Sequence, residues 1–313
     1  MLLVFGSINL DIAMRTERLP APGETVLGSA CLVSPGGKGA NQAHAARRYG
    51  MATMMVGAVG DDVFAAPALA QLVAAGVDVS RVQRLAGPTG CATVVVDTRG
   101  ENQIVVVPAA NLALLHTQVP DTLLAQAAAV LLQMETDAVQ NERLLQRATA
   151  MGCLTVLNNA PAQALSNAVL ESLDVLIVNE GELAFTVAGA GMVAGDAAAT
   201  LQALAVRHRL TAVLTLGSAG VLACTPDGAA IRLPALPVQV LDTTGAGDTF
   251  AGVLTAALIA ALPARGETAL RQALVQASVA AGLACTRLGA QVAQPDRAEI
   301  DAALPRYAAR AAA

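Results

Sequence analysis

The chain has 313 residues, of which 55% are hydrophobic and 14% are charged. This is enough apolar material for one large α/β domain with an appendage, or for two domains, and it argues against disorder. With 19 basic and 24 acidic residues the chain is mildly acidic. We therefore expect neither a nucleic-acid partner nor an anionic membrane surface.

The five cysteines lie far apart and form no CxxC pair: Cys31, Cys91, Cys153, Cys224 and Cys285. Such spacing favours reduced thiols in the core over a disulfide framework or a zinc site. No basic segment with a cleavage site precedes the apolar run that starts at Leu2. Together these features predict a cytoplasmic protein.

The first expected element is a short buried strand from Leu2 to Phe5. It stops at the polar stretch Gly6-Ser7-Ile8-Asn9-Leu10-Asp11. Ligands of α/β proteins lie at strand ends, so Asn9 and Asp11 could bind hydroxyl groups there. A polar turn held by its own side chains is the alternative.

A glycine loop at residues 35–43 runs into a helix that continues through Arg48. Its sequence, Pro-Gly-Gly-Lys-Gly-Ala-Asn-Gln-Ala, lacks the spacing of a phosphate-binding Walker loop. What remains is a concave surface lined by backbone, with Lys38 and Asn41 beside it. Such a surface suits close packing against a polar ligand.

Two β-rich runs, Thr93 to Asp97 and Gln103 to Val107, flank a polar turn and predict a hairpin. Strand-like residues also follow Gly23. We expect these segments, at about residues 12–34 and 88–108, to form a small antiparallel sheet that acts as a lid over the main sheet.

From about residue 121 strands and helices alternate, which predicts a mostly parallel sheet with right-handed crossovers. The expected strands are Val130 to Met134, Leu154 to Leu157, Val175 to Val178 and Val213 to Leu216. The expected helices are Ala138 to Ala150, Ala197 to His208, Phe250 to Leu262 and Thr268 to Cys285. Polar residues follow the strands and should converge on one rim: Glu135, Asn158, Asn159, Asn179, Glu180, Glu182 and the stretch 217–220.

The second glycine loop, Asp242-Thr243-Thr244-Gly245-Ala246-Gly247-Asp248, follows a β-like run from Val238 to Leu241 and opens into a helix. The first N–H groups of a helix attract anions, and glycines let an oxygen approach them. A carboxylate at Asp248 could then take a proton from a hydroxyl that attacks a phosphoryl group. Alternatively, Asp248 caps the helix.

Taken together, these motifs resemble the ribokinase (PfkB-type) family of carbohydrate kinases from Gly6 to about Pro295. The resemblance rests on ordered motifs, which are Gly6 to Asp11, Pro22 to Val26, Gly36 to Ala43, Asn179 to Glu182, Thr215 to Gly220 and Asp242 to Phe250. It implies a single ribokinase-like domain over residues 1–313, with a three-layer α/β/α fold and a β-sheet lid. It also implies a homodimer joined through the lid sheet.

The resemblance further implies ATP-dependent phosphorylation of a sugar, with the 5-hydroxyl of D-ribose as the leading acceptor. Deoxyribose, a nucleoside or another sugar is the alternative acceptor. A catalytically silent sugar-binding protein on the same fold is the alternative from another class. Two positions depart from the usual pattern: Ala109 replaces a glycine, and Ser278 stands where some members have histidine.

The roles implied by the resemblance fall into four groups. Asp248 would be the general base beside an anion hole made by Gly245, Ala246 and Gly247. The sugar would be held by Asn9, Asp11, Gly37, Lys38, Asn41 and Glu135. The nucleotide would contact Asn179, Thr215, Gly217, Gly220 and Gly247, with Asn179 and Glu182 orienting Mg²⁺. An activating K⁺ would lie near Asp242, Thr244 and carbonyls of the Arg287 to Gly289 loop.

Overall fold

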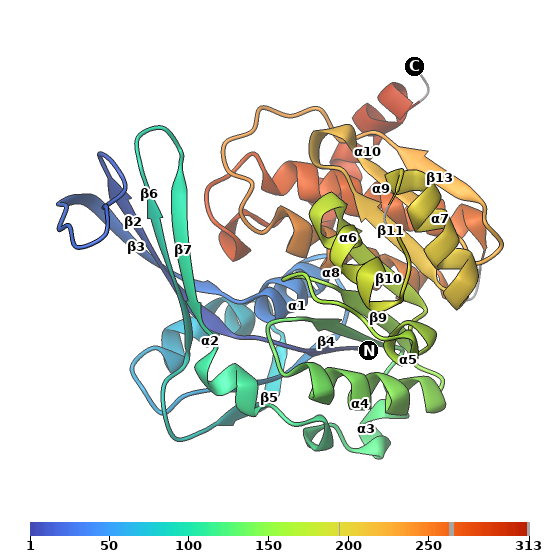
Figure 1. The fold of residues 1–313 in the computed structure, drawn as a ribbon, viewed down its shortest axis with the longest axis horizontal. Helices are drawn as coiled ribbons and strands as arrows, with labels where there is room; N and C mark the ends of the chain where they lie inside the picture. The colour runs from blue at the N-terminus through green and yellow to red at the C-terminus, as the bar shows by residue number, and fades with distance from the viewer. Residues whose placement is uncertain (194, 263–265, 312–313) are drawn as a thin grey trace.

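The protein is described by a computed structural model that covers residues 1–193, 195–262 and 266–311. A nine-stranded sheet forms its centre, in the order β13-β12-β11-β10-β9-β8-β1-β4-β5 (Figure 1). The strands are β1 (Leu2–Phe5), β4 (Thr53–Val59), β5 (Asp78–Arg84), β8 (Ala129–Gln133), β9 (Leu154–Asn158), β10 (Val175–Asn179), β11 (Thr211–Thr215), β12 (Val221–Cys224) and β13 (Ala230–Leu233). All neighbouring strands from β11 to β5 pair parallel, whereas β12 pairs antiparallel with both β11 and β13.

Helices cover both faces of this sheet, and each face has its own apolar core. One face carries α1 (Lys38–Arg48), α2 (Ala65–Ala75), α8 (Ala246–Ala260), α9 (Glu267–Ala284) and α10 (Arg297–Ala311). The other carries α3 (Asp121–Leu124), α4 (Ala138–Ala150), α5 (Asn167–Glu171), α6 (Glu180–Gly189) and α7 (Ala197–His208). Short 3-10 turns complete the chain at η1 (Ala109–Ala113), η2 (His116–Gln118), η3 (Gly217–Ala219) and η5 (Gln291–Ala293). The expected three-layer α/β/α fold is confirmed.

The central strands are continuous apolar runs because both of their faces are covered by helices. Every residue of β1, β4 and β8 is buried. The strand expected at residues 238–241 was wrong, since this segment has no strand partner. Pro237 lacks an N–H group, and the N–H groups of Leu241 and Asp242 donate to the carbonyl of Cys285 at the end of α9.

A second, four-stranded sheet stands away from the main body in the order β3 (Gly28–Gly36), β2 (Asn9–Thr16), β6 (Gly90–Val96) and β7 (Asn102–Val107) (Figure 1). We call it the lid sheet. The β2–β3 and β6–β7 pairs are antiparallel, as expected, but β2 and β6 pair parallel. The reason is that β2 and β6 continue directly from β1 and β5, which run in the same direction in the main sheet.

The part of the chain that the structure describes contains no helix long and apolar enough to cross a lipid bilayer. All five cysteines are free thiols. Cys153 and Cys224 are buried, as expected of core residues, whereas Cys31 is exposed on the lid sheet.

Helix α1 packs unusually close to α8, and Gly252 makes this possible. A Cβ at Gly252 would lie 2.4 Å from the carbonyl oxygen of Gln42 and 2.9 Å from the Cβ of Ala45. Only glycine therefore lets the two helices approach at this point. The contact fixes where the first turn of α1 lies relative to the first turn of α8.

We predict that Gly252→Ala lowers the free energy of unfolding by about 1–3 kcal/mol, because the added methyl must push α1 away from α8. The loss should appear even though alanine is the better helix former. Gly181→Ala, in exposed α6, is the matched control, because its Cβ would meet only the Asn179 side chain at 3.4 Å. Urea unfolding measures both, and a Gly252→Ala variant as stable as the wild type would contradict this packing argument.

Candidate active site

The polar residues converge where the main sheet meets the lid sheet. From β1 the main sheet continues through β4 and β5 on one side, and from β8 it continues through β9 to β13 on the other side. The order of the strands therefore reverses between the neighbours β1 and β8. Crevices of this kind, at the carboxyl ends of parallel strands, are the usual ligand sites of open α/β sheets. The segments that meet there follow β1, β8, β9, β10 and β11 and include the starts of α1 and α8.

Asp248 lies in the first turn of α8, which begins at Ala246, four residues before the expected Phe250. Gly245 holds the N-cap position with φ 73°, and no side chain caps this helix. The Asp248 carboxylate is buried and accepts hydrogen bonds from Asn41 Nδ2 at 2.9 Å and from Gln42 Nε2 at 3.0 Å. Its oxygens are therefore directed at α1 and not at the backbone that a cap would bind.

The glycine loop before Asp248 leads into the N-terminus of α8, and one of its N–H groups is already engaged. The N–H of Ala246 donates to the carbonyl of Thr243 at 3.2 Å. Gly247 faces open space, since a Cβ there would have no neighbour within 4 Å. A ligand oxygen can thus approach the backbone at Gly247, beside the positive end of α8.

Asn9 and Asp11 belong to β2, so the polar turn considered above is wrong for both residues. Asn9 is buried, and its Oδ1 accepts from Asn111 Nδ2 at 2.7 Å. Asn111 Oδ1 in turn accepts from the N–H of Ile8 at 2.9 Å, so Asn111 orients Asn9. Ala109, at the start of the same 3-10 turn, has φ 45°, a left-handed conformation that favours glycine.

Asp11 is a carboxyl group in an unfavourable place for a negative charge. Burial, the nearby Glu135 and the nearby Asp248 raise its pKa from 3.8 to about 7, although Lys38 acts in the opposite direction. Its Oδ1 is buried without a hydrogen-bond partner among the described residues. Asp11 is therefore an acceptor with unused capacity that faces the site.

Glu135 follows β8, and its carboxylate reaches the N-terminus of α1, where the helix dipole favours a negative charge. Its Oε2 accepts from Ser7 Oγ at 2.6 Å and from the N–H of Lys38 at 3.0 Å. Gly37, with φ 87°, allows this arrangement, because a Cβ there would lie 2.8 Å from the N of Asn9. Lys38 is nearly enclosed, and Asp248 above all, then Glu135, Glu182 and Asp11, raise its pKa. Its ammonium group thus balances a group of carboxylates.

A largely apolar pocket of about 550 Å³ opens beside the glycine loop, a size that suits a nucleotide. It brings together the expected nucleotide residues Thr215, Gly217, Gly220 and Gly247 with Ser278. Gly220 has φ 97° and lies so close to the chain that a Cβ would be 2.0 Å from the carbonyl oxygen of Leu233. The polar end of the pocket is the start of α8, where Ala246 and Gly247 line it.

Asn179 and Glu182 form the capping box of α6. Asn179 Oδ1 accepts from the N–H of Glu182, and Glu182 Oε2 accepts from the N–H of Asn179, both at 2.8 Å. Burial raises the pKa of Glu182, so the carboxylate lies partly out of water. The described residues contain no group of three or more His, Cys, Asp or Glu side chains that could hold a metal ion by themselves. The pair fits Mg²⁺, which keeps most of its waters and takes few protein ligands.

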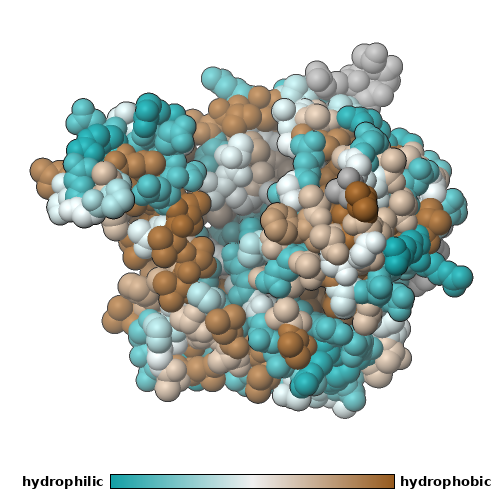
Figure 2. Space-filling view, in the orientation of Figure 1, coloured by the Kyte–Doolittle hydropathy of each residue, from teal (hydrophilic) through white to brown (hydrophobic). Residues whose placement is uncertain are grey.

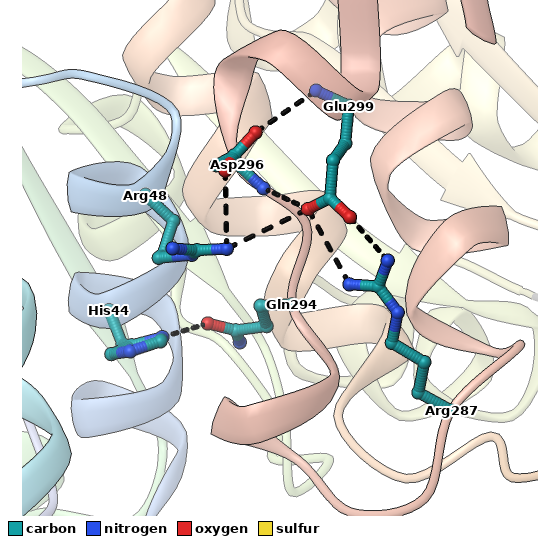
Figure 3. A network of polar contacts seen from close by, with 6 residues as sticks. All are labelled: His44, Arg48, Arg287, Gln294, Asp296 and Glu299. Carbon is teal, nitrogen blue, oxygen red and sulfur yellow. Dashed lines mark hydrogen bonds and ion pairs between the residues drawn. The ribbon is translucent and has the colours of Figure 1, made fainter.

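Asp242 ties the glycine loop to the loop after α9. Its Oδ1 accepts from the N–H and the hydroxyl of Thr244, at 2.9 and 2.6 Å, and its Oδ2 accepts from the N–H of Gly289 at 2.8 Å. Burial opposes ionisation, but these hydrogen bonds prevail and hold the pKa of Asp242 below its usual range. The Arg287 side chain points away to Glu299 (Figure 3), which leaves its backbone beside this loop.

Several buried amides of the site had no role in the sequence analysis: Gln42, Asn111, Gln133 and Gln291. Gln42 binds Asp248 directly, and its Nε2 also donates to Asn158 Oδ1 at 3.0 Å. The sequence feature that could have indicated such residues is a single amide at the end of an apolar run, such as Gln133 after Ala-Val-Leu-Leu. Burying such a group is costly unless it is hydrogen-bonded, so it indicates a polar network.

Comparison with known proteins gives a consistent result. Residues 1–297 match the model of the pfkB family of carbohydrate kinases. A ribokinase of Haemophilus influenzae is 33% identical over 304 residues, which cover 95% of this chain and 96% of that protein. The crystal structure of a Thermotoga maritima ribokinase superposes with a TM-score of 0.89 at 28% identity, covering 97% and 99% of the two chains. An Arabidopsis thaliana ribokinase in complex with ribose and ATP gives a TM-score of 0.86 at 31% identity, covering 97% and 98%.

The match extends over the whole site, from the loop after β1 to the loop after α9. The site combines a glycine loop at the start of a helix, a buried carboxylate and a nucleotide-sized pocket. The chain therefore belongs to the pfkB family of carbohydrate kinases, the family of the ribokinases, and is an enzyme that transfers phosphate to an alcohol group.

Proposed function

We propose that the chain transfers the γ-phosphoryl group of ATP to the 5-hydroxyl of D-ribose, with Asp248 as general base. The observation that carries this proposal is the position of Asp248. Its buried carboxylate lies between the polar side chains on β2 and α1 and the nucleotide-sized pocket. Relatives that are 33% and 31% identical are ribokinases, and another ribokinase was solved with ribose and ATP.

The sugar side of the site supplies acceptors and donors that ribose hydroxyls can use. Asn9, Asp11 and Asn41 lie on the side of Asp248 nearest the lid sheet, and Glu135 keeps one carboxylate oxygen free of the contacts described above. Gly37 lets the backbone approach a ligand closely. Asp248 would then accept the proton of the attacking hydroxyl, a role worth roughly 10²- to 10⁴-fold in rate.

The phosphate side is built from backbone amides and charge. The N–H groups of Gly245 and Gly247 would hold the oxygens of the transferred group, where preorganised donors are most effective. The N–H of Ala246 could join them only by leaving the carbonyl of Thr243. Lys38, whose pKa is raised above all by Asp248, supplies positive charge that balances the carboxylates. Asn179 and Glu182 would hold Mg²⁺, which would supply positive charge to neutralise the phosphates of ATP.

K⁺ fits the junction that Asp242 makes between two loops. The ionised carboxylate and the backbone carbonyls near Thr244, Arg287 and Gly289 are oxygen donors, which suit such a cation. Asp242 itself holds the glycine loop in place through its bonds to Thr244 and Gly289. The five free thiols support a reducing, cytoplasmic setting for this enzyme.

The test of the proposed function is sugar-dependent ADP release with ATP, Mg²⁺ and K⁺. We expect the highest kcat/KM with D-ribose, and lower values with deoxyribose, fructose and nucleosides. The methyl group of Ala109, next to the Asn9–Asn111 pair, is where a different preference would arise. A better acceptor than ribose would replace the sugar assignment, and a complete lack of ADP release would leave a silent binding protein.

We predict that ribose binds more tightly as the pH rises through about 7, because ribose hydroxyls donate to the ionised form of Asp11. The same pKa makes the unliganded protein lose stability as the pH rises from about 4 to 7. In that interval the folded chain keeps a proton that the unfolded chain has lost. Calorimetric titrations of wild type and Asp11→Asn measure the effect, which the variant should lack. A ribose affinity independent of pH in the wild type would show that Asp11 does not accept from the sugar.

The lid sheet also supports a homodimer. Side chains alternate across a strand, so Leu32, Ile104 and Val106 share the face of Asp11, while Val33, Val105 and Met14 lie on the opposite face. Figure 2 shows apolar residues along this sheet, and Val33 and Val105 are 52% and 65% exposed. The face of Asp11 can close over the sugar. The opposite apolar face needs another partner, and we propose the same face of a second copy.

Val105→Lys should convert the dimer to a monomer, because it places a charge on the apolar face proposed as the interface. Its neighbour Val106→Lys is the matched control on the other face. That variant should stay dimeric and weaken sugar binding instead. Light scattering after gel filtration distinguishes the two, and a wild-type chain that elutes as a monomer would rule out the dimer.

A further inference from the structure

Two chains of buried amides end on the proposed base. One oxygen of Asp248 accepts from Asn41 Nδ2, whose own Oδ1 accepts from Gln291 Nε2 at 3.1 Å. The other oxygen accepts from Gln42 Nε2, and Gln42 Oε1 accepts from Gln133 Nε2 at 2.7 Å. We call these chains the Gln291 relay and the Gln133 relay. Each delivers one N–H group to one carboxylate oxygen.

The outer members of both relays are as buried as any apolar core residue. Gln133 is 0% exposed and Gln291 is 2% exposed. Room for Gln133 exists only because residue 6 is glycine, since a Cβ there would lie 1.9 Å from Gln133 Oε1. The Oε1 atoms of Gln133 and Gln291 have no hydrogen-bond partner among the described residues. An unpaired buried acceptor is costly, so the bond that each N–H group donates is the contribution these two amides make in return.

The order of donors and acceptors fixes which way the inner amides face. An ionised carboxylate only accepts, so Asn41 must turn its Nδ2 to Asp248 and its Oδ1 away. Gln291 Nε2 only donates, and it occupies the place where that Oδ1 points. Without this donor, Asn41 Oδ1 would lose its partner, and the Asn41 amide would be held only by its bond to the carboxylate.

We propose that Gln291 and Gln133 are positioning residues that act through Asn41 and Gln42 to hold the Asp248 carboxylate in its reactive orientation. This inference rests on the proposed role of Asp248 as base. Neither outer glutamine touches Asp248, because each reaches it through an amide of α1. The relays join three distant parts of the chain: β8, α1 and the 3-10 turn η5 after α9.

The segment that carries Gln291 is fastened to α1 along its length, so its position relative to Asn41 is fixed. Gln294 Nε2 donates to the backbone carbonyl of Asn41 at 3.0 Å, and Gln294 Oε1 lies 2.6 Å from His44 Nδ1. Further along, Arg48 forms ion pairs with Asp296 and Glu299 at 3.6 and 3.7 Å (Figure 3). Gln294 thus supports the same helix but is not part of either relay.

The test is a double-mutant cycle on kcat for sugar-dependent ADP release. Gln291→Met keeps the length of the side chain and removes the donor, and it should lower kcat roughly 10-fold while the KM for ATP changes less than about 2-fold. In an Asn41→Ala background, the same substitution should change kcat less than about 2-fold, because the relay is already broken. Gln133→Met should behave in the same way against Gln42→Ala.

Gln294→Met is the matched control, since it removes a buried amide from the same segment. Its hydrogen bond goes to the Asn41 backbone, which Asn41→Ala retains. We therefore expect this control to lower the thermal midpoint about as much as Gln291→Met, with the same effect on kcat in both backgrounds. Gln291→Ala serves as a second variant if Gln291→Met does not fold.

The outcomes separate the inference from the proposed function. If the wild type releases no ADP with any sugar, the proposed function is wrong, and the proposal that the relays position a catalytic base is wrong with it. If the wild type is active but the Gln291 and Asn41 effects are additive, the relay is wrong and Gln291 is only a structural residue. A Gln291→Met enzyme with wild-type kcat overturns the relay in the same way.

Discussion

The hydrogen bonds from the first turn of α1 to Asp248 are the constraint on which the rest of the site depends. They require α1 and α8 to start close together, and Gly252 permits that approach. They also require the chain to turn sharply into α1, which Gly37 allows with its positive φ. The carboxylate is therefore placed by two helices that pack on the same face of the sheet, and not by a flexible loop.

Electrostatics explains why the site needs its ligands. The carboxyl groups of Asp248, Glu135, Glu182 and Asp11 all raise the pKa of Lys38. Burial, together with the charges of Glu135 and Asp248, raises the pKa of Asp11 to about 7. Mg²⁺ and hydroxyl donors from a sugar would relieve this repulsion, so the binding of substrates and the ionisation of Asp11 are linked.

Much of the fold followed from apolar periodicity, since helices such as Ala138–Ala150 and Ala197–His208 lie where the pattern placed them. Local pattern failed at residues 238–241, because apolar, β-branched residues there line a pocket and do not pair. The sequence motifs correctly indicated that Asp248, Asn41 and Asp11 lie close to one another. Gln291 could not be found in this way, because its partner Asn41 is distant in the sequence and only packing brings them together.

The measurement that tests the account most directly compares Asp248→Asn with the wild type, by calorimetric ribose binding and by turnover at saturating ribose and ATP. The substitution keeps the size of the side chain and removes its ability to take a proton. The account predicts ribose affinity within about 10-fold of the wild type and a kcat lower by roughly 10²-fold or more. A variant with near-normal kcat would contradict the account and would leave Asp248 with a structural role.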